Sequence, residues 1–277
     1  VLVHGDTSTT FATALACFYL KIPVGHVEAG LRTYNIDSPF PEEFNRQAVG
    51  IVAKYNFAPT EKAKENLIKE GKKADTIYVT GNTAIDALKT TIKDNYYHKE
   101  FDWIGNSKLI LITAHRRENI GKPMHNMFRA IRRIVEEYSN IRVIYPIHMN
   151  PAVRQIASEE LGNCENIHII EPLDVIDFHN FMKKSYLILT DSGGIQEEAP
   201  GLGKPVLVMR DTTERPEGID AGTLKLVGTD EDNIYSSFKV LIDNEEEYKK
   251  MSQAKNPYGD GYASVRIADV LERGVIQ

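Results

Sequence analysis

The sequence has little cysteine and no long uninterrupted apolar segment, and each shortage narrows the class of protein. Its only cysteines among 277 residues, Cys17 and Cys164, lie far apart in apolar surroundings and match no disulfide or metal-binding spacing. We therefore expect buried thiols in a reducing compartment. No apolar run approaches the roughly 20 residues that cross a bilayer, and the first residues lack the pattern of a signal peptide. These shortages predict a cytoplasmic protein without a membrane partner.

Clustered positive charge is also missing. The chain has 33 lysines and arginines against 39 aspartates and glutamates, which gives a formal net charge of -6, and its basic residues are scattered. Nucleic-acid binding needs concentrated positive charge, so we expect no nucleic-acid partner. With 42% hydrophobic and 26% charged residues the composition is that of a globular protein. The length predicts two domains of about 100 to 150 residues each.

Short apolar segments alternate with amphipathic segments of helical length along the whole chain, as in stacked βαβ units. Runs such as "LILIT" are apolar throughout, which is typical of a parallel strand covered on both faces. The pattern predicts an α/β fold with two doubly wound parallel sheets. Strands are expected at residues 1–4, 24–28, 56–59 and 76–80, and then at 108–113, 141–147, 166–170, 186–190 and 204–209.

A polar and aromatic stretch without clear periodicity, residues 93–107, separates the two groups of strands. Such a stretch is typical of a linker between domains. We therefore expect a first domain over 1–93 and a second over 94–258. The remaining residues, 259–277, contain a Pro/Gly loop and then an amphipathic helix.

Polar residues follow several of the predicted strands, at the edge where α/β sheets bind their ligands. Asp6, Glu28, His115 and His148 each come just after an apolar strand. Glu42 and Glu43 follow Pro41 at a predicted helix start. An acid there is also favoured by the helix dipole, and Asp6 also fits a capping position. Taken as a set, carboxylates and histidine suit proton transfer beside a phosphate leaving group. No spacing typical of a metal site is present.

The segment "LTDSGGIQEEAPGLGKPV" predicts an anion-binding loop at a strand end. Ser192, Gly193 and Gly194 offer hydroxyl and N–H donors to a diphosphate, since glycine allows close backbone approach. Glu198 lies where an acid accepts hydrogen bonds from ribose hydroxyls in nucleotide folds. We expect Glu197 to be a helix-start or surface residue.

Arginines follow two further predicted strands. Arg116 and Arg117 lie in "AHRREN", and Arg215 lies in "RDTTERPEG". A guanidinium group binds phosphate bidentately, but each arginine also fits an ion pair with a neighbouring acid. Both interpretations remain open from the residues alone.

Long motifs in one order carry a resemblance to a known family. The segments "HGDT", "HVEAGLR", "PFPEEFNR", "GNTAIDAL", "AHRREN", "YPIHMNP", "LTDSGGIQEEAPGLGKPVLVMRDTTERPEG" and "NPYGDG" closely resemble the non-hydrolysing UDP-N-acetylglucosamine 2-epimerases of bacteria. The resemblance implies a GT-B-like fold with two Rossmann-like domains, a cleft between them, and a last helix that crosses back. The first domain would then comprise 1–93 and about 259–277.

The resemblance implies an isomerase (EC 5.1.3.14) that interconverts UDP-N-acetylglucosamine and UDP-N-acetylmannosamine without NAD or an obligatory metal. In this family UDP is thought to leave first, through an oxocarbenium-like state, and to add back to bound 2-acetamidoglucal with protonation on the other face. The product feeds cell-surface polysaccharides. The family is usually dimeric, so the resemblance also implies a homodimer.

The resemblance assigns roles residue by residue. Asp6, Glu28 and Glu42 match the catalytic carboxylates, and His115 matches the histidine near the diphosphate. The matches to the UDP site are Phe178, Ser192, Gly193, Gly194, Glu198 and Arg215. A second substrate molecule is known to activate the family, and Arg117 and His148 are expected to line that second site.

The chain departs from the family at its start. Family members open with a strand and a Gly-Thr-Arg-Pro-Glu loop, which does not precede Val1 here, so we expect the first domain to be incomplete. Two alternatives remain: a GT-B glycosyltransferase, and an inactive fragment that binds a UDP-sugar.

Overall fold

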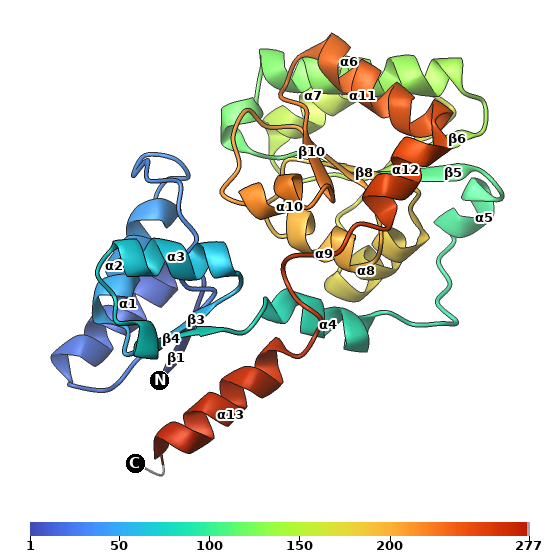
Figure 1. Cartoon of the computed structure of the whole chain (residues 1–277). Helices are drawn as coiled ribbons and strands as arrows, with labels where there is room; N and C mark the ends of the chain where they lie inside the picture. Colours follow the sequence, from blue (N-terminus) through green and yellow to red (C-terminus); the bar gives the residue numbers. More distant parts are fainter. Residues whose placement is uncertain (276–277) are drawn as a thin grey trace. The chain divides into compact units, whose positions relative to one another are not determined.

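The computed structural model describes residues 1–275 and divides into two compact units (Figure 1). The first unit comprises Val1–Ala87 and the chain from Pro257 on, and the second comprises Leu88–Asn256. One division therefore falls inside helix α4 (Thr83–Thr91). The boundaries predicted from sequence, after residues 93 and 258, lie a few residues downstream of both divisions. That the two units are functional domains stays a prediction.

The first unit is built on a four-stranded parallel sheet in the order β1-β2-β3-β4. Each strand is short and is followed by a helix, as the alternating pattern predicts. The elements are β1 (Leu2–His4), α1 (Ser8–Tyr19), β2 (Gly25–Val27), α2 (Glu42–Val52), β3 (Tyr55–Ala58), α3 (Glu61–Lys69), the 3₁₀ turn η1 (Ala74–Thr76), β4 (Ile77–Val79), α4 and α13 (Ala263–Val275).

Helices cover this sheet with small apolar clusters. Val3 of β1 packs with Ala14 and Cys17 of α1 and with Val49 of α2. A separate cluster joins Val27, Phe57 and Ile267, so that α13, the last helix of the chain, packs on β2 and β3. A helix more than 200 positions away in sequence thus covers these strands, because parallel strands need cover on both faces.

The second unit has a six-stranded parallel sheet in the order β10-β9-β8-β5-β6-β7. The strands are β5 (Lys108–Thr113), β6 (Ile141–Pro146), β7 (Ile167–Ile170), β8 (Leu187–Thr190), β9 (Val206–Val208) and β10 (Leu224–Leu226). Its other elements are α5 (Glu100–Ile104), the 3₁₀ turn η2 (Arg117–Asn119), α6 (Lys122–Glu137), α7 (Pro151–Leu161), α8 (Val175–Lys184), α9 (Ile195–Gly201), α10 (Pro216–Asp220), α11 (Glu231–Asp243) and α12 (Glu245–Ser252).

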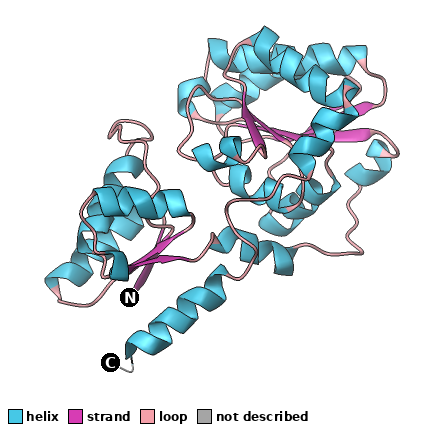
Figure 2. Ribbon diagram, in the orientation of Figure 1, coloured by secondary structure: helices cyan, strands magenta, loops and turns pink. Residues whose placement is uncertain are grey.

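The large core of the second unit lies between its sheet and α6, α7 and α11, while α8 and α9 lie on the other side of the sheet (Figures 1 and 2). Ile110 and Ile112 of β5 and Val143 of β6 are fully buried in this core. Continuous apolar strands were the signal for such a covered sheet, and the fold class is confirmed.

The structure corrects details of the sequence prediction. β10 is a sixth strand that was not expected, because its residues, LKL, include a lysine and form no continuous apolar run. The stretch predicted as an aperiodic linker contains α5, whose residue Ile104 is buried. Cys17 is buried, but Cys164 is only half-buried, and both thiols are free. Of the expected C-terminal helix, the part up to Val275 is helical, and residues 276 and 277 lie outside the described residues.

No helix within the described residues is both long enough and apolar enough to cross a membrane.

His26 of β2 holds the loop after β1. Its imidazole is almost completely buried, and Nε2 lies 2.8 Å from the carbonyl oxygen of Gly5. Because a carbonyl only accepts, Nε2 carries the proton, and the unprotonated Nδ1 has no hydrogen-bond partner among the described residues. Burial lowers the pKa of His26 to about 4 and outweighs the opposite effect of the Gly5 carbonyl. His26 is therefore neutral in the folded protein at neutral pH.

The buried His26 predicts a loss of stability in acid. Above pH 6.5 the imidazole is neutral in both folded and unfolded chains, and between pH 6.5 and about 4 only the unfolded chain takes up the proton. The free energy of unfolding should therefore fall by roughly 3 kcal/mol across this range through His26 alone. Urea unfolding of the wild type and of His26→Gln, which keeps a donor but does not titrate, measures this as a difference in pH dependence. Equal slopes for the two proteins would contradict the prediction.

Candidate functional site

In the first unit, two sequence-predicted carboxylates lie on neighbouring loops. Asp6 follows β1 and Glu28 follows β2, and these strands are paired in parallel with His4 opposite Val27. Their loops therefore leave the same edge of the sheet. The Glu28 Oε2 atom would lie 3.2 Å from a Cβ placed on Gly5, which also has a positive φ of 67°. A glycine at position 5 thus admits the Glu28 carboxylate beside the loop that carries Asp6.

Asp6 is held by helix α2. The Nη2 atom of Arg46 donates to Asp6 Oδ2 at 2.5 Å, and Asn45 Nδ2 donates to the Asp6 carbonyl oxygen at 2.8 Å. The N-cap of α1 is Thr7, whose side chain accepts from Thr10 N–H. Asp6 is therefore not the capping residue, which removes one structural explanation for an acid at this position.

Glu28 has a strained backbone. Its φ is 68°, in the left-handed region that residues other than glycine rarely occupy. Such a conformation costs about 1 to 3 kcal/mol and persists where the surroundings hold it, often at functional sites. His4 Nδ1 lies 3.9 Å from Glu28 Oε2, and burial is the main cause that lowers the pKa of His4.

Glu42 and Glu43 begin α2, as predicted, but the two side chains differ in burial. Glu42 is half-buried, and no pairing of its side chain with a described residue is observed. It lies four residues before Arg46, hence on the same side of the helix as the group that binds Asp6. Glu43 is fully buried and hydrogen-bonded to a neighbouring loop. The structure therefore separates a half-buried acid one helical turn before Arg46 from an acid whose carboxylate is used in internal hydrogen bonds.

In the second unit, three sequence-predicted positions meet at the carboxyl edge of the sheet. His115, His148 and Ser192 follow β5, β6 and β8, which are adjacent in the sheet. The imidazoles of His115 and His148 stack, with ring centroids 5.2 Å apart and planes 14° from parallel. The topology therefore brings together residues more than 30 positions apart.

Asp191 organises this edge, and sequence reasoning missed it. Its fully buried carboxylate accepts the backbone N–H of His115 at 3.0 Å and that of Arg116 at 2.9 Å, as well as Asn119 Nδ2 at 3.1 Å. The only sequence signal was its position in "DSGG", directly after a strand. Asp191 thus ties the His115 loop to the loop that contains Ser192.

The imidazole of His115 is neutral near pH 7. Burial lowers the pKa of His115 from its ordinary 6.5; the nearby Asp191 carboxylate acts in the opposite direction, and His148 lowers it further. Near pH 7 a lowered pKa leaves the ring uncharged, with one nitrogen as donor and the other as acceptor. His115 is therefore suited to donate a hydrogen bond or to move a proton at a ligand oxygen.

The predicted anion loop leads into α9, with one correction. The backbone N–H of Ser192 donates to Thr190 Oγ1 at 2.9 Å, so Ser192 has its hydroxyl, and not its N–H, to offer a ligand. Within the described chain, the N–H groups of Gly193 and Gly194 have no hydrogen-bond partner, as expected at the start of a helix. Two glycine N–H groups and a serine hydroxyl form the donor set.

Glu197 was expected at a helix start or on the surface; it does lie in the first turn of α9, but it is not a surface residue. Glu197 is buried, and its Oε1 accepts from Arg215 Nε at 2.5 Å. Arg215 also pairs with Glu214, which in turn accepts from Arg210. The Arg215 guanidinium packs on the backbone at Gly193, where an added Cβ would lie 2.7 Å from Nη1. The buried acid neutralises an arginine set directly beside the anion loop.

Glu198 and Phe178 are linked through His179. Helix α8 carries half-buried Phe178 and buried His179, and His179 Nε2 lies 3.6 Å from Glu198 Oε2. The other ring nitrogen of His179 is 2.7 Å from Thr91 Oγ1. The two residues expected at the base and ribose therefore lie on adjacent helices joined by a buried imidazole, which the sequence did not reveal.

Within residues 1–275, no hydrogen bond or ion pair joins Arg117 to His148. Arg117 is exposed at the start of η2, and His148 is exposed and accepts the N–H of Asn150 through Nδ1. Over the same residues, no group of three His, Cys, Asp or Glu side chains is arranged to hold a metal ion. The proposed second site thus has only His148 beside His115 in its favour.

Replacing Asp191 should disrupt the His115 loop. The change Asp191→Asn puts an amide among three N–H donors where only acceptors fit, and we expect a loss of about 2 kcal/mol of stability because hydrogen bonds to a buried carboxylate are lost. Urea unfolding measures the loss, and the ring NMR signals of His115 should shift. Asp220→Asn, at an exposed position of α10, is the control. Unchanged stability in Asp191→Asn would contradict the role given to its carboxylate.

Comparisons with known proteins agree over almost the whole chain. A family model described as UDP-N-acetylglucosamine 2-epimerase matches residues 1–272. The UDP-N-acetylglucosamine 2-epimerase of Bacillus subtilis strain 168 is 66% identical over 271 residues, which make up 98% of this chain and 71% of that protein.

Solved structures show the same fold. The structure of S. aureus MnaA with UDP matches with a TM-score of 0.98 at 59% identity, over 99% of this chain and 75% of that one. The UDP-GlcNAc 2-epimerase from Neisseria meningitidis bound to UDP-GlcNAc matches with a TM-score of 0.93 at 50% identity, over 99% and 76%. The fold is therefore GT-B-like, and the chain belongs to the UDP-N-acetylglucosamine 2-epimerase family.

Proposed function

We propose that this chain interconverts UDP-N-acetylglucosamine and UDP-N-acetylmannosamine by inverting carbon 2 of the sugar. The observation that carries the proposal is the family match over residues 1–272, together with 66% identity to the Bacillus subtilis enzyme. The two groups of side chains fit the two demands of this reaction. The first unit supplies carboxylates for proton transfer, and the second supplies donors for a diphosphate.

The reaction proceeds by elimination and addition of UDP. The bond from carbon 1 to the UDP oxygen breaks with its electron pair going to UDP, and a protein base removes the proton on carbon 2, which leaves a double bond in 2-acetamidoglucal. Addition of UDP to carbon 1 and of a proton to the opposite face of carbon 2 gives the epimer. No net oxidation takes place, and the reaction needs proton carriers for both faces.

Asp6, Glu28 and Glu42 are the proton carriers in this proposal. Their carboxylates also stabilise positive charge that develops on the sugar as UDP leaves. The adjacent loops after β1 and β2 support this assignment for Asp6 and Glu28, and the position of Glu42 one helical turn before Arg46 supports it for the third acid.

The second unit holds and releases UDP. The Ser192 hydroxyl and the N–H groups of Gly193 and Gly194 receive the diphosphate, and the guanidinium of Arg215, paired with Glu197 and Glu214, packs beside them on the backbone at Gly193. Glu198 accepts the ribose hydroxyls and Phe178 packs on the base. His115, neutral because of its lowered pKa, donates a hydrogen bond or a proton to the departing phosphate oxygen.

The same proposal includes regulation and assembly. A second substrate molecule would bind beside His148 and Arg117 and activate the enzyme. The protein would act as a homodimer in the cytoplasm, and its product would serve cell-surface polysaccharide synthesis.

The direct test is turnover by the purified full-length protein. Incubation with UDP-N-acetylglucosamine in D₂O should produce UDP-N-acetylmannosamine by NMR, with deuterium at carbon 2, because the proton carriers exchange with solvent. Free N-acetylmannosamine and UDP as sole products would instead indicate a hydrolysing enzyme. Transfer of the sugar to an added acceptor without epimerisation would indicate a glycosyltransferase. Epimerisation without deuterium at carbon 2 would rule out the proposed proton transfer.

Neutralising one carboxylate should stop the chemistry and spare UDP binding. Glu28→Gln and Glu42→Gln should each lower kcat by at least about 100-fold, the range that general acid and base groups contribute. The Kd for UDP, measured by calorimetry, should stay within about threefold because UDP contacts lie in the second unit. Glu61→Gln, an exposed acid of α3, is the matched control. Turnover unchanged in both glutamine variants would argue against the assigned carboxylates.

A further inference from the structure

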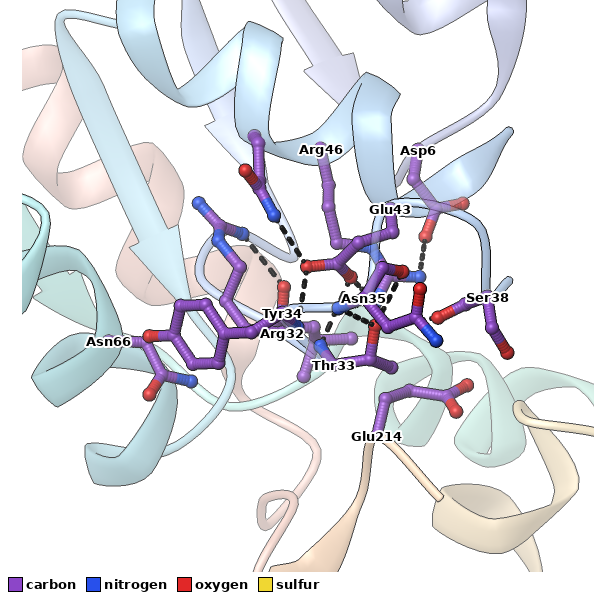
Figure 3. A network of polar contacts seen from close by, with 12 residues as sticks. Asp6, Arg32, Thr33, Tyr34, Asn35, Ser38, Glu43, Arg46, Asn66 and Glu214 are labelled. Atoms are coloured by element: carbon purple, nitrogen blue, oxygen red, sulfur yellow. Dashed lines mark hydrogen bonds and ion pairs between the residues drawn. The ribbon is translucent and has the colours of Figure 1, made fainter. Parts of the chain in front are cut away.

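Helix α2 carries a buried ion pair that the assigned reaction residues do not include. Figure 3 shows Glu43 and Arg46 side by side, with Arg46 reaching Asp6. The side chain of Glu43 is fully buried, that of Arg46 is 5% exposed, and that of Asp6 is 26% exposed. The three groups therefore form a series from the interior to the surface, and only its last member is open to a ligand.

Arg46 fixes one oxygen of Asp6 and leaves the other unpaired. Its Nη2 atom donates to Asp6 Oδ2 at 2.5 Å, while Oδ1 has no hydrogen-bond partner in the described part of the protein. Asn45, the preceding residue of α2, holds the Asp6 backbone carbonyl at 2.8 Å. With main chain and one carboxylate oxygen both held by the same helix, the direction of the remaining oxygen is fixed.

Glu43 in turn anchors α2 to the loop after β2. Its carboxylate accepts the N–H groups of Thr33 and Tyr34, each at 3.1 Å, and the side-chain amide of Gln47 at 2.8 Å. Tyr34 has a φ of 60°, an uncommon conformation that these hydrogen bonds support. Glu43 Oε2 also lies 3.3 Å from Arg46 Nη1. The negative charge thus neutralises Arg46 and holds the neighbouring loop in the same place.

Stability alone would not favour a buried Glu43–Arg46 ion pair over well-packed apolar side chains. Buried ion pairs lose much of their attraction to desolvation and are weak evidence for stability. Here Nε and Nη1 of Arg46 are buried without an aligned hydrogen bond, which adds a further cost. What the pair provides is a guanidinium group at a fixed position against Asp6.

We propose that Arg46 is a positioning residue for Asp6, and that Glu43 holds Arg46 in that position. The proposal rests on the proposed function, since it takes Asp6 as a proton carrier. A carboxylate must meet the proton on carbon 2 in a defined direction, and a misplacement of about 1 Å can cost about 100-fold in rate. The Glu43–Arg46 pair sets that direction without touching the substrate.

Substitutions of Arg46 should separate positioning from binding. In Arg46→Met, kcat should fall about 100-fold while KM and the Kd for UDP change by less than about threefold. Arg46→Lys keeps the positive charge but replaces the planar guanidinium group with an ammonium group. It should retain more activity than Arg46→Met. Glu43→Gln keeps one acceptor oxygen, puts an amide NH₂ among the donors that the other oxygen accepted, and removes the buried counter-charge; it should lower kcat less than Arg46→Met does.

Chemical rescue distinguishes a positioning role from a structural one. Millimolar guanidinium chloride should restore part of kcat in Arg46→Ala, because the small cation can occupy the position beside Asp6. Urea, which has a similar shape and no charge, should not restore it. Rescue by both compounds, or by neither, would overturn the proposal.

The control is a second ion pair in the same unit, in which the Arg32 side chain is buried and that of its partner Glu70 is 29% exposed. Arg32 donates to both carboxylate oxygens of Glu70, at 2.6 and 2.8 Å, and none of its hydrogen bonds seen in the described residues goes to Asp6. Arg32→Met should lose comparable stability in urea unfolding and keep kcat, per folded molecule, within about threefold of wild type. An equal loss of kcat in Arg32→Met and Arg46→Met would overturn the proposal.

A double-mutant cycle completes the test. If Arg46 acts through Asp6, adding Arg46→Met to Asp6→Asn should lower kcat little further, and multiplied losses would contradict it. Turnover of the wild-type protein in the same assay separates the two levels of inference. Its absence would reject the proposed function, whereas normal wild-type turnover with an active Arg46→Met would reject only the positioning role.

Discussion

The parallel pairing of short strands is the constraint on which the rest of the molecule depends. Every pair in both sheets is parallel, so every strand ends at the same edge as its neighbour. The loops that carry Asp6 and Glu28, and those that carry His115 and Ser192, are adjacent for this reason alone. The helices that return the chain to the opposite edge then cover the sheet, and their first turns become available to the loops.

Buried acids stabilise these strand-end loops without facing a ligand. Asp191 joins the loops after β5 and β8, and Glu43 joins α2 to the loop after β2. Glu197 neutralises Arg215 beside the anion loop. Each carboxylate satisfies N–H donors that would be costly to leave unpaired in the interior. The reacting and binding groups are thereby preorganised by acids that the reaction does not consume.

The sequence predicted the half-buried members of this arrangement more readily than the fully buried ones. Asp6, Glu28 and His115 stand out because they directly follow apolar strands. Asp191 also follows a strand, but the sequence pattern predicted a ligand-binding role only for its neighbours Ser192, Gly193 and Gly194. The Asp191 carboxylate is buried and binds loop N–H groups instead. Glu197 looked like a helix-start acid, and only the fold shows that Arg215 lies against it. The strand β10 was not predicted because Lys225 interrupts its apolar residues, and the helix α5 was not predicted because five residues are too few to show a helical period.

Apolar periodicity and long motifs are local properties of the chain, so they were enough to predict the fold class, the family and every strand except β10. The tertiary structure decided which acids are buried, which arginine meets which carboxylate, and where the last helix packs. Those pairings join Arg46 to Asp6 across 40 positions and Asp191 to His115 across 76. No local pattern encodes them, since the partners become neighbours only once the parallel sheets and their covering helices have formed.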